Sequence, residues 1–186
     1  MRIISGDFRG KKISLPTNKK TRPLRDLVKE SIFNLIEHSN KFNINILNSN
    51  ILDLFSGSGS FGLECISRKA SKVTFVEYYD EVLSVLKKNI SKLNIENKCK
   101  IFDEDCFNFL GKKKNFSEKF DLIFIDPPYK EEKINQIIDV IKDNKILSED
   151  GVLIIHRHKK DNITITKRLN ILDERKYGIS KIIFGN

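Results

Sequence analysis

The stretch Asp53-Leu54-Phe55-Ser56-Gly57-Ser58-Gly59-Ser60-Phe61-Gly62 joins an apolar run of strand type to a predicted helix. Its glycines let the backbone turn tightly and let a ligand approach closely, beside the positive end of the helix. The spacing Gly57-x-Gly59-x-x-Gly62 matches the dinucleotide fingerprint, and Glu77 ends the next predicted strand, where an acid would bind ribose hydroxyls. The stretch therefore predicts a strand-turn-helix unit that binds an adenosine-containing cofactor, without separating NAD from other such cofactors.

Around this unit, strands and helices alternate. The predicted strands are Ile51–Phe55, Lys72–Glu77, Cys99–Phe102, Phe120–Ile125 and Val152–Arg157. The predicted helices between them are Ser60–Lys69, Asp80–Leu93, Phe107–Leu110 and Glu132–Asp143. Such alternation is typical of a mostly parallel sheet that is covered on both faces. A closing hairpin, Leu169–Lys176 and Ile179–Phe184, would add one antiparallel strand, so we expect an α/β, Rossmann-like fold with a seven-stranded sheet.

Size and composition favour one globular domain. The chain has 186 residues, of which 39% are hydrophobic, and its apolar stretches are far shorter than a membrane span. No signal-peptide region follows Met1, so we expect a cytoplasmic protein. Cys65, Cys99 and Cys106 have no CxxC spacing, and the three histidines form no metal set with them. We therefore expect reduced thiols and no metal.

The start of the chain is predicted to form a basic extension. Arg2–Ser5 and Lys11–Leu15 are short strand candidates joined by a turn with glycine at both ends, and a helix is predicted from Arg25 to Glu37. Residues 1–30 carry nine Lys or Arg against three acids, a net charge of +6, whereas the whole chain carries +9. Such a segment is typical of a surface that contacts a polyanion. The cations expected to hold phosphates are Arg9, Lys11, Lys12, Arg22 and Arg25.

Acidic side chains follow the first three strands of the predicted sheet. Asp53 precedes the glycine turn, where it can face a cationic amine, and Asp105 can accept a hydrogen bond from an adenine amine. Acids at these positions suit a ligand with a sulfonium, an ammonium, a ribose and an adenine better than they suit a pyrophosphate. The predicted cofactor-binding residues are Asp53, Phe55, Gly57, Ser58, Gly59, Glu77, Asp105 and Cys106.

A second motif, Asp126-Pro127-Pro128-Tyr129, ends the apolar strand Phe120–Ile125. Proline fixes φ and biases the preceding residue towards extended conformations, so this motif predicts a stiff loop at the carboxyl edge of the sheet, where ligands bind. The Asp126 carboxylate and the carbonyls of Asp126 and Pro127 could accept the hydrogens of an exocyclic NH₂ group. Tyr129 would stack on the face of its ring.

These motifs together resemble the S-adenosylmethionine-dependent methyltransferases that modify exocyclic base amines. The N-terminal Arg2-Ile3-Ile4-Ser5-Gly6-Asp7-Phe8-Arg9-Gly10-Lys11-Lys12-Ile13, with Thr21-Arg22-Pro23 and Glu30-x-x-Phe33-Asn34-Leu35, is similar to one family in particular. It is the bacterial small-subunit ribosomal RNA guanine-N2 methyltransferases, the RsmD family. The resemblance extends over essentially the whole chain. His156 departs from the family, which usually has glutamate there, and Ser56 and Phe61 depart from Ala and Ala or Leu.

The resemblance implies a class I methyltransferase fold, S-adenosylmethionine as cofactor, and methylation of a guanine N2 amine in 16S ribosomal RNA by a monomer. The substrate would be small-subunit RNA, naked or in a partly assembled particle. The implied division is an RNA-binding extension over residues 1–45 and a catalytic domain over residues 46–186. The implied catalytic residues are Asp126, Pro127, Pro128 and Tyr129.

Three alternatives stay open at the level of the sequence. A DNA adenine-N6 methyltransferase shares the Asp126–Tyr129 motif, but it normally needs a larger target-recognition region. An NAD-linked oxidoreductase would explain the glycine turn and leave Asp126–Tyr129 and the basic extension unexplained. A non-catalytic RNA-binding module could have kept the same fold.

Overall fold

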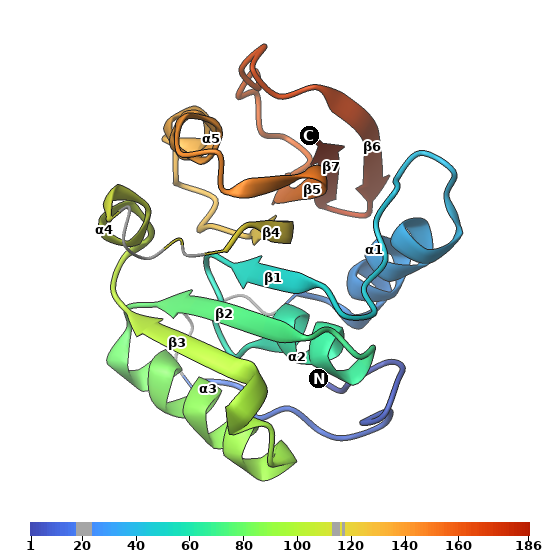
Figure 1. Cartoon of the computed structure of the whole chain (residues 1–186), viewed down its shortest axis with the longest axis vertical. Helices are drawn as coiled ribbons and strands as arrows, with labels where there is room; N and C mark the ends of the chain where they lie inside the picture. Colours follow the sequence, from blue (N-terminus) through green and yellow to red (C-terminus); the bar gives the residue numbers. More distant parts are fainter. Residues whose placement is uncertain (18–23, 113–115, 117) are drawn as a thin grey trace.

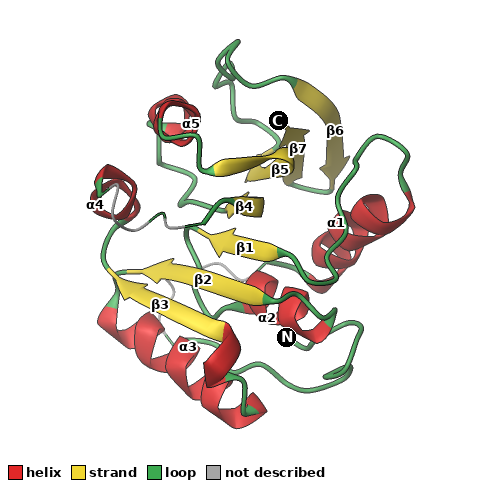
Figure 2. Ribbon diagram, viewed as in Figure 1, coloured by secondary structure: helices red, strands yellow, loops and turns green. Residues whose placement is uncertain are grey.

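The computed structural model describes residues 1–17, 24–112, 116 and 118–186, and its centre is one seven-stranded sheet with helices on both faces (Figures 1 and 2). The strands are β1 (Asn50–Asp53), β2 (Lys72–Glu77), β3 (Cys99–Asp103), β4 (Phe120–Ile125), β5 (Leu147–His158), β6 (Ile171–Tyr177) and β7 (Ser180–Gly185). The helices are α1 (Asp26–His38), α2 (Ser60–Ser67), α3 (Asp80–Leu93), the 3₁₀ turn η1 (Glu96–Lys98), α4 (Cys106–Gly111) and α5 (Ile134–Asp143).

The strand order β3-β2-β1-β4-β5-β7-β6 confirms the predicted fold class. Strands β1 to β5 pair in parallel, and β7 pairs antiparallel with both β5 and β6. The chain moves outward from β1 to β3 and then returns to β4 on the other side of β1. Loops that leave β1 and β4 therefore diverge at the carboxyl edge, and the crevice between them is the usual ligand site of an open α/β sheet.

Alternation along the central strands creates two hydrophobic layers. In β4, Leu122 and Phe124 face the layer that contains α1, α2 and α3, whereas Ile123 and Ile125 face the layer that contains α4 and α5. All four side chains are at most 2% exposed. Because both faces are covered, β4 reads as a continuous apolar run, which is the pattern expected for a buried parallel strand.

The predicted N-terminal hairpin is present only as an isolated bridge between Arg2 and Lys12. The amides of Ile3 and Ile13 donate across the hairpin to the carbonyls of Lys11 and Met1 at 3.0 and 3.1 Å, whereas the amides of Ile4 and Ser5 donate to the Glu64 carboxylate of α2 at 2.7 and 2.9 Å. Gly6 makes this docking possible, because its φ is +81° and a Cβ there would lie 1.9 Å from a backbone oxygen of α2. The predicted strand lengths were therefore wrong, because contacts with α2 replace a longer ladder.

Lys29 counts toward the positive charge of the N-terminal segment, but it is not part of the exposed surface of that segment. Its side chain is fully buried, donates to the carbonyl of Arg2 at 2.8 Å, and lies 3.4 Å from the Glu64 carboxylate. Burial lowers the pKa of Lys29, and the Glu64 charge opposes that shift. Lys29 thus joins the N-terminal segment to α2 and offers no charge to a polyanion.

The predicted element boundaries differ from the observed ones mainly at β5, which begins five residues before the predicted Val152. The early residues pair with Phe120 across a register shift in β4, so their pattern is not the regular alternation of a strand. Helix α5 begins at Ile134, two residues after the predicted start. Within the described residues, no helix is long and apolar enough to cross a membrane.

Candidate active site

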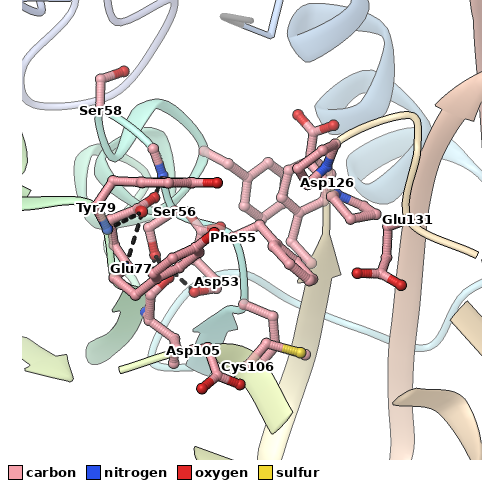
Figure 3. A pocket seen from close by; sticks show the side chains of 18 of the residues that line it. Asp53, Phe55, Ser56, Ser58, Glu77, Tyr79, Asp105, Cys106, Asp126 and Glu131 are labelled. Carbon is pink, nitrogen blue, oxygen red and sulfur yellow. Dashed lines mark hydrogen bonds between the residues drawn. The ribbon is translucent and has the colours of Figure 1, made fainter. Parts of the chain in front are cut away.

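A cavity of ≈ 470 Å³ opens at the carboxyl edge of β1, β2 and β4 (Figure 3). The glycine turn, the residues after β2, the start of α4 and the loop after β4 contribute to its wall. All four predicted catalytic residues line it, as do all predicted cofactor-binding residues except Gly59. In Figure 3, Asp126 and Glu131 lie on one side of the cavity, and Glu77 and Tyr79 lie on the other. The two predicted halves of the site therefore share one chamber.

The glycine turn needs its glycines for two different reasons. Gly57 has φ of +56°, and a Cβ added there would meet no atom within 4 Å, so the backbone of Gly57 faces open space beside the cavity. Gly59 has φ of +82°, and a Cβ there would lie 2.5 Å from the Leu86 side chain. Gly59 is the N-cap of α2 and does not line the cavity. Its positive φ closes the turn at the start of α2.

The Glu77 carboxylate is held by backbone amides. Oε2 accepts from the Gly57 amide at 2.9 Å, and Oε1 accepts from the amides of Tyr78 and Tyr79 at 2.9 and 3.0 Å. These contacts tie the end of β2 to the glycine turn. A carboxylate has about four acceptor positions, so Glu77 retains capacity for ligand hydroxyl groups while its orientation is fixed.

Asp53 has an unsatisfied hydrogen-bond acceptor in the cavity wall. Its Oδ2 accepts from the Gly62 amide at 3.2 Å, whereas Oδ1 is buried and has no hydrogen-bond partner among the described residues. Burial raises the pKa of Asp53 to about 8; the Gly62 amide opposes this, and the nearby Asp126 and Glu77 charges add to it. A buried acceptor with a raised pKa fits a ligand that brings a positive charge.

Asp105 and Cys106 lie at the start of α4. The Asp105 carboxylate caps this helix, since its Oδ1 accepts from the amides of Phe107 and Asn108 at 2.9 and 3.1 Å, and its Oδ2 contacts the Asn108 side chain. Burial raises the pKa of Cys106 to about 12, so this thiol is neutral and lines the wall as a small apolar group. Among the described residues, no cluster of His, Cys, Asp and Glu could hold a metal ion.

The Asp126 carboxylate points towards β5 and remains 17% exposed. Its Oδ1 lies 2.8 Å from Nδ1 of His156, and Nε2 of the same ring lies 2.8 Å from the Ser180 hydroxyl. The Tyr129 ring meets His156 and His158 edge to face, with centroids 6.3 and 5.0 Å away. The carboxylate and the tyrosine are therefore both positioned by histidines at the end of β5.

Arg157 fixes the backbone of the loop after β4. Its guanidinium donates to the carbonyls of Pro128, Tyr129 and Glu131 at 3.4, 3.2 and 2.9 Å. The side chain is 3% exposed and forms an ion pair with Asp161. One planar cation thus holds three backbone carbonyls of the loop that follows Asp126.

The four described cations that were predicted to bind phosphates do not line the cavity. Arg9, Lys11 and Lys12 are exposed on the N-terminal turn, and Arg25 is exposed at the N-cap of α1. Arg22 lies outside the described residues. Arg9, Lys11, Lys12 and Arg25 form no ion pair with a described residue, so their charges face solvent.

Several residues that line the cavity were not predicted. Tyr78 and Tyr79 follow Glu77 directly, and their rings lie 4.0 Å apart at the rim, so their position after a strand was a usable signal. Glu131 follows the Asp126–Tyr129 motif by two residues. Pro16 and Leu24 reach the cavity from the N-terminal segment, and no local pattern indicates this.

Comparisons with known proteins identify relatives of the chain in sequence and in structure. A family model described as Conserved hypothetical protein 95 matches residues 1–186. The chain is 34% identical to "Ribosomal RNA small subunit methyltransferase D" of Buchnera aphidicola subsp. Acyrthosiphon pisum (strain APS), over 93% of this chain and 86% of that protein. The solved structure of yhhF from Escherichia coli has a TM-score of 0.82 at 26% identity, covering 100% of this chain and 96% of that one. HI0767 from Haemophilus influenzae has a TM-score of 0.78 at 30% identity, covering 99% and 96%.

Proposed function

The chain belongs to the family of ribosomal RNA small subunit methyltransferases D, and from this premise we propose that it methylates the exocyclic N2 amine of a guanine in small-subunit (16S) ribosomal RNA. The coarser activity, methyl transfer to ribosomal RNA, follows from the family. The guanine N2 amine is our assignment. The observation that supports it most is one cavity lined both by Asp53, whose Oδ1 has no hydrogen-bond partner among the described residues, and by the Asp126–Tyr129 loop.

S-adenosylmethionine is the cofactor, and it supplies an activated methyl group when bound. The residues present fit its chemistry. The buried Oδ1 of Asp53 can accept from its ammonium group, and Glu77 can accept from its ribose hydroxyls. The apolar wall at Cys106 and the Asp105 carboxylate suit the adenine. The open space at Gly57 leaves room for the rest of the ligand to pass close to the protein backbone.

Asp126 and the Pro127 carbonyl are proposed to accept the two hydrogens of the guanine amine. The lone pair of this nitrogen is delocalised into the purine ring, so the free amine is a poor nucleophile. Two acceptors would favour a pyramidal nitrogen whose lone pair points along one direction. Good alignment of this kind can contribute about 7–11 kcal/mol to lowering a barrier. Asp126 need not be a strong base, because the alkylated nitrogen readily loses its proton to solvent.

Tyr129 is proposed to stack on the target base after it turns out of its RNA loop. Unstacking a base costs a few kcal/mol, least where the base is already unpaired. The edges of His156 and His158 against the Tyr129 ring limit its rotation, which supports a role as a fixed platform. Pro128 is exposed beside it and keeps the loop extended.

The segment 1–45 is proposed as the RNA-binding extension of the catalytic domain 46–186. Arg9, Lys11, Lys12, Arg25 and, outside the described residues, Arg22 would hold phosphates. We propose that the protein acts as a monomer in the cytoplasm, on an assembled or partly assembled small subunit. A polyanion contact of this kind weakens steeply as salt increases.

The test is tritiated-methyl labelling of undermethylated small subunits with the purified protein, followed by nucleoside analysis. We expect label in N2-methylguanosine. Label in another nucleoside would overturn the assignment of the guanine amine and leave ribosomal RNA methylation intact. A complete lack of label in RNA, with S-adenosylmethionine bound, would favour a non-catalytic RNA-binding module.

A further inference from the structure

The register of the sheet places His156 beside Asp126. Strands β4 and β5 pair in parallel with Ile125 opposite Ile155, so Asp126, which follows the end of β4, lies beside His156, which is still within β5. His156 continues the face of Ile154, and Asp126 continues the face of Phe124, and both of these apolar residues belong to the layer of α1 to α3. The 2.8 Å contact between the two side chains therefore follows from strand pairing.

This contact dictates which nitrogen of His156 carries a proton. An ionised carboxylate can only accept, so Nδ1 must be the donor to Oδ1 of Asp126. In the neutral ring, Nε2 is then an acceptor, and the Ser180 hydroxyl, which lies 2.8 Å away and is 2% exposed, can donate to it. Ser180 belongs to β7, which pairs with β5 on its other side. Groups from β5, from β7 and from the end of β4 therefore favour the Nδ1–H tautomer of His156.

The same contact divides the Asp126 carboxylate into two oxygens with different surroundings. Oδ1 is occupied by His156, whereas among the described residues we find no hydrogen bond to Oδ2. The side chain is 17% exposed and lines the cavity. Without His156, rotation about χ2 would exchange the two oxygens freely, because a carboxylate torsion is broad and two-fold.

We propose that His156, held by Ser180, is a positioning residue for methyl transfer. It fixes the plane of the Asp126 carboxylate so that Oδ2 faces the substrate amine. This inference rests on the proposed role of Asp126 and adds two residues, His156 and Ser180, to the machinery of the same site. Arg157, the next residue along β5, holds the backbone of the same loop from the opposite face of the sheet.

The first test compares two replacements of His156 in the full-length protein, with 16S RNA particles as substrate. His156→Leu removes both ring contacts, and we expect kcat to fall about 10- to 100-fold while the KM for RNA stays within about threefold. His156→Asn keeps an amide donor close to the position of Nδ1, and we expect it to recover most of that loss. His38→Leu is the matched control, because His38 is exposed at the end of α1 and should leave kcat unchanged.

The second test needs no RNA. The ¹⁵N shifts of the His156 ring report its tautomer, and we expect the Nδ1–H form in the wild type and in Ser180→Ala, with loss of that preference in Asp126→Ala. The Nε2–H tautomer in the wild type would overturn the proposal, as would a His156→Leu enzyme with unchanged kcat. If His156→Leu does not fold, Ser180→Ala decides instead, because it removes the contact that holds the ring: an unchanged kcat in this variant would overturn the proposal. Failure of the wild type to methylate RNA would count against the proposed function. The tautomer measurement would still test whether His156 donates to Asp126.

Discussion

The proposed cofactor half of the cavity (Asp53, Glu77 and Asp105) and its proposed acceptor half (Asp126–Tyr129) hold their carboxylates in different ways. Glu77 accepts from backbone amides of the glycine turn and of its own next residues, and Asp105 accepts from the first amides of the helix that it caps. Asp126 is held by an imidazole, and the loop that follows it is held by a guanidinium, both from β5. Backbone therefore shapes one half, and side chains shape the other.

This difference has a mechanistic meaning. Amides of a turn or a helix end are present whatever the side chains are, so a site held by them tolerates substitution of its neighbours. A loop held by side chains depends on two particular residues, His156 and Arg157, and loses its geometry when either is replaced. The acceptor half should therefore be the more fragile one, and the two halves should be separable by mutation.

The largest effect is expected at Asp126. Asp126→Ala removes the proposed acceptor of the amine, so we expect methyl transfer to fall by about 1,000-fold or more, whereas the Kd for S-adenosylmethionine should change only a few-fold. Single-turnover rates and isothermal titration would measure the two quantities. Asp143→Ala is a suitable control, because that carboxylate is exposed on α5. A fully active Asp126→Ala enzyme would contradict the prediction that mutation of the acceptor half impairs methyl transfer separately from cofactor binding.

Arg157 should show the next largest effect. Arg157→Met releases three loop carbonyls, so kcat should fall about 10- to 100-fold with cofactor affinity unchanged. It also removes the ion-pair partner of the half-buried Asp161, which keeps only its hydrogen bond from the Ile163 amide and the nearby Lys181 charge, and this should cost about 1.5–3 kcal/mol in unfolding free energy.

The double variant Arg157→Met/Asp161→Asn separates these two effects of Arg157. Because it removes the unpaired charge, it should restore most of the stability in denaturant titrations without restoring kcat. Recovery of kcat together with stability would mean that Arg157 acts only on folding and does not position the loop.

Asp53 gives the cofactor half a pH signature. Because the pKa of Asp53 is about 8, its carboxyl is protonated at pH 6, whereas a bound ammonium favours the ionised form. Binding must then release a proton, so the affinity for S-adenosylmethionine should rise between pH 6 and 7.5, by up to about 30-fold in total. Titration calorimetry in buffers of different ionisation enthalpy measures that proton. Asp53→Asn should abolish the pH dependence, and a wild type without it would exclude the ammonium contact.

The smallest effect is expected from the N-terminal turn, which belongs to neither half. Reversing Arg9, Lys11 and Lys12 to Glu should weaken RNA binding about tenfold at low salt and reduce its salt dependence, with no change in cofactor affinity. Filter binding over a salt series would measure this. The same change at Lys87, Lys88 and Lys92, which are exposed on α3, controls for net charge. Equal losses in both triple variants would mean that net charge alone attracts the RNA.

Local features carried most of the correct predictions. The strand Phe120–Ile125 and the helix Asp80–Leu93 were predicted with their observed boundaries, because a buried apolar run and a 3.6-residue period are both visible in short windows. The glycine turn and the Asp126–Tyr129 motif were located in the cavity wall for the same reason. The predicted hairpin strands were too long, because the amides of Ile4 and Ser5 donate to α2, about sixty residues away, and not across the hairpin.

The amino-acid sequence alone determined the order of the elements, the parallel sheet and the residues at its carboxyl edge, since φ restrictions and hydrophobic periodicity are local properties. Only the tertiary structure decided that Lys29 is buried, that Gly59 closes the turn without lining the cavity, and that His156 and Arg157 hold the acceptor loop. These contacts join residues that are brought together by strand order, and strand order arises from the packing of two hydrophobic layers across the whole chain.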